Sequence, residues 1–170
     1  INDSRFGLRY KWYEGDIATF TVNGAAIIEG NYDTGAITAI GDGGSGFELS
    51  GIVGLQSGNG FFATGEAGFR SRSNDIPDEW FANISGAYAF TDSFSASLSY
   101  QVVRSDGDFN IGGPGFSPAR FPELDEDYDL AFAGFNVKAS DQWSIGAGYG
   151  RKLDGRNTAK SDFWNASVGY

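Results

Sequence analysis

The sequence predicts an all-β protein that forms a closed antiparallel up-and-down transmembrane β-barrel of about ten strands, with about eight strands as the second choice. Three observations predict this fold. Polar and apolar residues alternate along repeated segments of about 9 to 13 residues, the links between the segments are alternately short and long, and aromatic residues gather at the segment ends. Residues 1–170 are expected to form a single domain.

The clearest strand is residues 94–102, which read FSASLSYQV. Apolar residues such as Phe94 and Leu98 occupy every second position, and serines and a glutamine lie between them. A period of two places these sets on opposite faces of a strand. Serine is small and neutral and suits a crowded, wet interior, so we expect the apolar face to turn outward, into lipid. The other expected strands are residues 5–13, 17–29, 33–40, 47–55, 61–72, 80–90, 129–138, 143–150 and 164–170, of which 33–40 is the weakest.

Composition excludes several classes of protein. The 170-residue chain has no cysteine and no histidine, so it has no disulfides or thiolate metal sites and lacks the commonest general base. Its formal charge of −10 argues against nucleic acid as a partner, because phosphate contacts need a basic surface. The longest apolar runs, such as AAII at 25–28, are far shorter than the ~20 residues of a membrane-spanning helix.

The links between the expected strands alternate in length. Residues 57–60, 91–93 and 139–142 are short links, whereas the links near 71–79, 105–127 and 153–161 are long. Outer-membrane barrels have short periplasmic turns and long external loops. Continued toward the N-terminus, this alternation places 41–46 and 14–16 outside and 30–32 inside, and ten strands would then leave both termini in the periplasm.

Aromatic residues mark both ends of the expected strands. Two such girdles around a plainer apolar band are typical of a lipid-facing surface. The periplasmic set is Phe61, Phe90, Phe94, Trp143 and Tyr170, and the external set is Trp12, Phe69, Trp80, Tyr149 and Trp164.

With its final segment FWNASVGY, which has apolar residues at every second position before a terminal aromatic residue, the chain resembles bacterial outer-membrane β-barrel proteins of the small-barrel and porin-like group. This resemblance implies a place in the outer membrane, contact with the lipid bilayer and lipopolysaccharide, and insertion by the barrel-assembly machinery. The proteases, phospholipases and acyltransferases of similar architecture use catalytic histidine, which this chain lacks. We therefore expect no enzymatic activity and no cofactor.

Charged residues on the polar face would line the interior of the barrel. One interpretation is a structural ion-pair network in which the two glutamates satisfy the arginines, which a narrow, packed barrel favours. The other is a basic constriction that selects anions. The candidates are Arg5, Arg9, Lys11, Glu48, Glu66, Arg70 and Arg72.

The longest link, 105–127, carries the weak metal candidates Asp125, Glu126 and Asp127, which could hold a divalent cation that bridges lipopolysaccharide. Its earlier acidic residues fit a calcium-binding loop poorly, because Ile111 and Ser117 stand where glycine and glutamate are needed. The same link could instead fold into the interior, as its three phenylalanines suggest.

The function that follows is a non-enzymatic, porin-like outer-membrane barrel with a narrow passage for small solutes or ions. Two alternatives stay open. One is a plugged structural or adhesion barrel whose external loops bind a partner or lipopolysaccharide. The other is a soluble β-barrel that binds a ligand inside.

Overall fold

Nine β-strands make up the part of the chain that the structure, a computed structural model, describes: residues 3–30, 44–74, 76–107, 127–158 and 160–169. No helix in these residues is long and apolar enough to cross a bilayer. The strands are β1 (Ser4–Glu14), β2 (Ala18–Ile28), β3 (Gly46–Gln56), β4 (Phe61–Arg72), β5 (Glu79–Thr91), β6 (Phe94–Ser105), β7 (Asp127–Lys138), β8 (Ser144–Arg156) and β9 (Asp162–Gly169).

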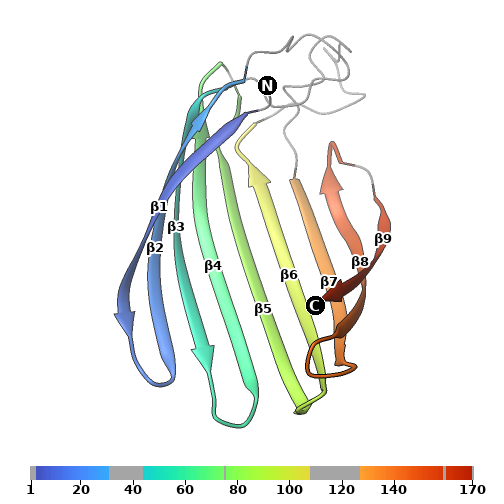
Figure 1. Cartoon of the computed structure of the whole chain (residues 1–170). Coiled ribbons are helices and arrows are strands. Elements are labelled where there is room, and N and C mark those ends of the chain that lie inside the picture. Colours follow the sequence, from blue (N-terminus) through green and yellow to red (C-terminus); the bar gives the residue numbers. More distant parts are fainter. Residues whose placement is uncertain (1–2, 31–43, 75, 108–126, 159, 170) are drawn as a thin grey trace.

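The strands form a single sheet in sequence order, and every neighbouring pair is antiparallel. Figure 1 shows a curved sheet in which successive strands run up and down beside one another, with β1 and β9 at its two edges. These edge strands form no ladder with each other, so the sheet is open across the described residues. The up-and-down antiparallel topology is as predicted, whereas closure into a barrel is not part of what the structure shows.

Hydroxyl side chains and one glycine shape the short turns at one end of the sheet. Thr91 Oγ1 accepts hydrogen bonds from the backbone N–H groups of Ser93 and Phe94 at 3.2 and 3.0 Å, which closes the turn between β5 and β6. Ser140 does the same between β7 and β8. Gly60, between β3 and β4, has φ of 86°, a left-handed conformation that glycine adopts without steric cost. The local sequence therefore explains why these links are tight.

The strand order corrects the expected placement of the strands at the N-terminal end. β2 pairs directly with β3, from Ala18 opposite Leu55 to Ile27 opposite Gly46, so no strand lies between them. The weak expected strand 33–40 falls outside the described residues. The turn at 14–16 joins β1 to β2 at the same end as the other short turns, which reverses its predicted placement, and Gly30 follows β2 at the opposite end. Residues 31 and 32 of the link expected at 30–32 fall outside the described residues.

Two further expectations change with the strand order. The described chain crosses the sheet nine times, once in each strand from β1 to β9. Ser4 and Gly169 therefore lie at opposite ends of the sheet, and the described chain does not bring both of its ends to one side. Trp12 lies beside the β1–β2 turn, with its ring 6.3 Å from that of Phe20, and belongs to the aromatic residues of the short-turn end. A bulge between Lys11 and Tyr13 interrupts the alternation there.

The two faces of the sheet differ as the alternation predicts. We call the side of Phe94 and Leu98 the apolar face and the side of Ser95 and Ser99 the polar face. Large side chains on the apolar face are open to the surroundings: Leu98 is 68% exposed, Ile84 63% and Ile145 51%. The most buried side chains of the described residues, Glu48 foremost at 2% exposed, lie instead on the polar face. The described sheet therefore lacks the shared apolar core that a soluble sandwich needs.

Phenylalanine rings on the polar face lie flat over glycines of the neighbouring strand. Phe81 on β5 is opposite Gly68 on β4, and a Cβ on Gly68 would stand 2.3 Å from its ring and 2.7 Å from the carbonyl oxygen of Leu49. Phe132 and Phe163 cover Gly148 and Gly150 of β8 in the same manner. These glycines make room for rings that would otherwise project into the space above the polar face.

The substitution Gly68→Ala should therefore destabilise the protein by about 1–3 kcal/mol, since the added methyl overpacks a site closed by backbone as well as ring atoms. Gly65→Ala is the matched control on the same strand, because nothing lies within 4 Å of a Cβ there. Denaturant unfolding in detergent micelles measures both. Equal midpoints for the two variants would show that the ring does not depend on the glycine.

Candidate functional site

A row of alternating charges crosses the polar face of β3, β4 and β5. The register aligns Glu48, Arg70 and Glu79 on these neighbouring strands. Arg70 donates to Glu48 Oε2 through Nε and Nη2, at 3.0 and 2.9 Å, and to Glu79 Oε2 through Nη1, at 2.8 Å. Both donors to Glu48 thus share one carboxylate oxygen, and all three hydrogen bonds are strengthened by the opposite charges. Arg70 is thus held by two carboxylates, one on each side.

Glu48 is the centre of this cluster. Arg5 reaches it from β1, past the intervening strand β2, and donates to its other oxygen, Oε1. Arg72 lies at the far end, with Nη2 3.8 Å from Glu79 Oε2. An almost fully buried carboxylate needs such partners, because desolvation of an unpaired charge is costly. We refer to Arg5, Glu48, Arg70, Arg72 and Glu79 as the charge ladder.

A second chain of hydrogen bonds, which contains no cation, lies next to the ladder. The Ser50 hydroxyl donates to Glu66 Oε1 at 2.6 Å, and Asn23 Nδ2 lies 3.4 Å from the Ser50 oxygen. Asn23 and Ser50 are both buried. The expectation that both glutamates pair with arginine therefore holds for Glu48, whereas Glu66 takes a hydroxyl donor instead.

The remaining two candidates lie apart from the ladder. Lys11 pairs with Glu14 at 2.8 Å near the β1–β2 turn, where both side chains are exposed. Arg9 is opposite Asn23 on the polar face and is exposed. Within the described residues, no carboxylate pairs with Arg9. Among the described residues of this face, Lys152 on β8 likewise has no carboxylate partner; its ammonium group contacts the Thr158 hydroxyl and the Tyr128 ring.

Sequence reasoning missed Glu79 and Phe81. Glu79 precedes the segment that was predicted to begin at residue 80, yet it continues the alternation of Phe81 and Asn83 on the polar face. Extending that strand by one residue would have found it. Phe81 adds a cation–π contact, with its ring 5.6 Å from the Arg70 guanidinium carbon.

Of the three metal candidates, only Asp127 lies within the described residues. Asp125 and Glu126 fall outside the described residues. Asp127, at the start of β7, forms an ion pair with Arg156 at 3.1 Å and accepts a hydrogen bond from the Ser105 backbone. Among the residues that the structure describes, no three acidic side chains come together in a metal-binding group.

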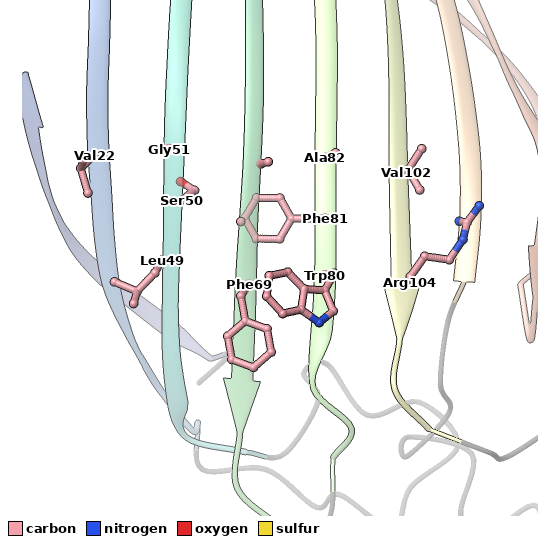
Figure 2. A pocket seen from close by; sticks show the side chains of 12 residues that line it. Val22, Leu49, Ser50, Gly51, Phe69, Trp80, Phe81, Ala82, Val102 and Arg104 are labelled. Atoms are coloured by element: carbon pink, nitrogen blue, oxygen red, sulfur yellow. The ribbon is translucent and has the colours of Figure 1, made fainter. Parts of the chain in front are cut away.

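A shallow groove marks the apolar face (Figure 2). Its floor is a row of small residues, Gly51, Ala67 and Ala82, on β3, β4 and β5. The rings of Phe69 and Trp80 lie together beside this row, with centroids 4.7 Å apart. The groove is lined almost wholly by apolar groups and belongs to the opposite face from the charge ladder, so the two features are separate.

No family model and no curated protein matches the chain. Among solved structures, the chain is similar to OmpTdeltaL8, described as a loop L8 deletion mutant of OmpT, an outer membrane protein of Vibrio cholerae. The TM-score is 0.68 at 16% sequence identity, and the match covers 98% of this chain and 53% of that chain. The chain thus spans about half the length of this structure. The likeness shows the fold, a sheet of the kind found in outer-membrane β-barrels.

Replacing Glu48 by glutamine should destabilise the protein by about 2 kcal/mol, because Arg5 and Arg70 would lose a common counter-charge. The expected destabilisation is smaller than for the loss of a fully buried ion pair, since both arginines are partly exposed. Glu14→Gln removes an exposed partner of Lys11 and should have no measurable effect. Denaturant unfolding in detergent compares the two. If Glu48→Gln left the free energy of unfolding unchanged, a structural role for the ladder would be contradicted.

Proposed function

We propose that the chain forms the wall of a bacterial outer-membrane β-barrel whose polar face borders a water-filled passage for small solutes or ions. The observation that carries the proposal is the distribution of side chains across a single-layered sheet. Leu8 and Trp164, on the apolar face, are 85% and 78% exposed, while Glu48 and Ser50, on the other face, are buried. Such a sheet is stable only where its exposed apolar face meets lipid.

The placement of aromatic residues supports the same environment. Phe61, Phe90 and Phe94 lie next to the short turns, and Trp80 and Trp164 lie near the opposite end. Aromatic rings favour the two interfaces of a bilayer. In this proposal the short-turn end faces the periplasm, and the end with the long links faces outward and meets lipopolysaccharide.

The polar face supports a passage. Serine and glycine occupy many of its positions on β6 and β8, which leaves space above the sheet. The width of a barrel grows with its strand number, and barrels of about 16 strands hold aqueous channels. The similar structure has nearly twice the length of this chain, which is compatible with such a width.

A passive role fits the chemistry of the chain better than catalysis. It has no histidine or cysteine, and the ladder glutamates are engaged by arginines. We therefore propose a non-enzymatic function in which the ladder keeps the wall rigid and Arg9 contributes charge to the passage.

The membrane assignment predicts that the protein partitions with the membrane and is extracted by detergent but not by high salt or alkaline carbonate. It should also migrate faster on electrophoresis before heating than after, because a folded barrel resists the denaturing detergent. Fractionation and gel mobility measure both properties. A protein that remains dissolved and folded without detergent would contradict the proposal.

The passage predicts steady ion conductance in a planar bilayer, and Arg9→Glu should shift the reversal potential in a salt gradient toward greater cation selectivity. Arg151→Glu is the matched control, because it makes the same change of charge on the apolar face. The control should leave selectivity unchanged. Absence of conductance would favour a plugged barrel whose outer loops bind a partner, and equal shifts would show that Arg9 does not face the passage.

A further inference from the structure

Two phenylalanine rings lie together on the polar face, over the central strand of β7, β8 and β9. Phe132 on β7 and Phe163 on β9 have ring centroids 6.2 Å apart, and their planes are inclined by only 15°. Phe132 covers Gly148 and Phe163 covers Gly150, so one side of each ring rests on the β8 backbone. Phe163 is 40% exposed and Phe132 is partly exposed. We refer to these two rings as the platform.

The platform differs from the third ring of this kind, Phe81, in what lies above it. The Arg70 guanidinium carbon is 5.6 Å from the centroid of the Phe81 ring, so a cation already occupies the outer side of Phe81. Among the residues that the structure describes, no cation lies over Phe132 or Phe163. The platform is therefore an open apolar patch on a mostly polar face, and such patches mark binding surfaces.

A cation lies beside the platform. Lys152 follows Gly150 by two residues on the same face of β8, about 7 Å farther along the strand. Its ammonium group donates to Thr158 Oγ1 at 2.5 Å and lies 4.9 Å from the centroid of the Tyr128 ring, and within the described chain no carboxylate neutralises it. The four-carbon stem of lysine is flexible, so the ammonium group can turn toward an anion held over Gly150.

We propose that Phe132, Phe163 and Lys152 form a binding site for aromatic carboxylates on the wall of the passage. The ring of the solute stacks on the platform, and its carboxylate pairs with Lys152 through a charge-assisted hydrogen bond. A saturated ring or a neutral aromatic molecule would meet only one of these two features. The inference deepens the proposed function and rests on it, because a polar face that borders water leaves the platform accessible to solutes.

Benzoate tests the site in the full chain isolated in detergent, where saturation-transfer NMR measures the dissociation constant against a blank of empty micelles. Cyclohexanecarboxylate keeps the charge but lacks the aromatic ring, and benzamide keeps the ring but lacks the charge. Each should bind at least about fivefold more weakly than benzoate. Equal binding of the three probes, or no benzoate signal above the blank, would overturn the inference.

Two substitutions locate the binding on the protein. Phe132→Leu removes one ring and Lys152→Gln removes the charge, and each should weaken benzoate binding about fivefold. Phe135→Leu makes the same change on the same strand but on the apolar face, and Lys138→Gln does so for a lysine that pairs with Asp141 beside a short turn. Both controls should bind benzoate as the native protein does. Unchanged binding by Phe132→Leu and Lys152→Gln would contradict the site.

The outcome for this site is separate from the outcome for the passage, because binding in detergent does not depend on conductance. A protein that conducts ions but does not bind benzoate would overturn the site and leave the passage in place. A protein that binds benzoate but does not conduct would instead overturn the passage and show that the platform faces a closed interior.

Discussion

The structure depends on the need of every backbone amide and carbonyl for a hydrogen-bond partner within the sheet. In the proposed location the bilayer supplies no such partner, so the strands must satisfy one another edge to edge. That requirement would account for the single layer, the sequential up-and-down order and the long strands. The described side chains form no shared apolar core and divide instead into an apolar and a polar face.

The charge ladder shows how charged side chains are accommodated on the polar face of the sheet. Opposite charges alternate from strand to strand, and Glu48 is shared by Arg5 and Arg70. Because each contact joins different strands, the ladder links β1, β3, β4 and β5 by side chains as well as by the backbone ladder. Arg9 lies on the same face and has no carboxylate partner among the described residues. The proposal therefore gives the paired charges a structural role and Arg9 an electrostatic one.

The sequence predicted the strands well because a period of two survives in most of them. It predicted the apolar face of β6 and β5 residue by residue. It misplaced the turn at 14–16, because the alternation of link lengths was counted through the weak expected strand 33–40. Trp12 sits in a bulge that breaks the alternation, and no local signal distinguishes the turn at Gly15 from an external loop.

The site was predicted in its residue types but not in its pairings. Which residues lie opposite each other depends on the register between paired strands. A single sequence gives no direct signal of that register. Glu48 was expected to meet arginine and does. Glu66 was expected to do the same, but the register brings Ser50 within reach of its carboxylate instead.

The flat rings over glycine have a consequence for how the strands find their alignment during folding. If β4 slid by two residues against β5, Phe81 would meet the side chain of Glu66 or Arg70 in place of Gly68. The ring would then clash with a long side chain, and the misaligned pair of strands would be less stable than the native one. A shift by two residues would preserve the backbone hydrogen-bond pattern of β4 and β5, so that pattern alone does not fix their register. The fit of Phe81 over Gly68 favours the native register.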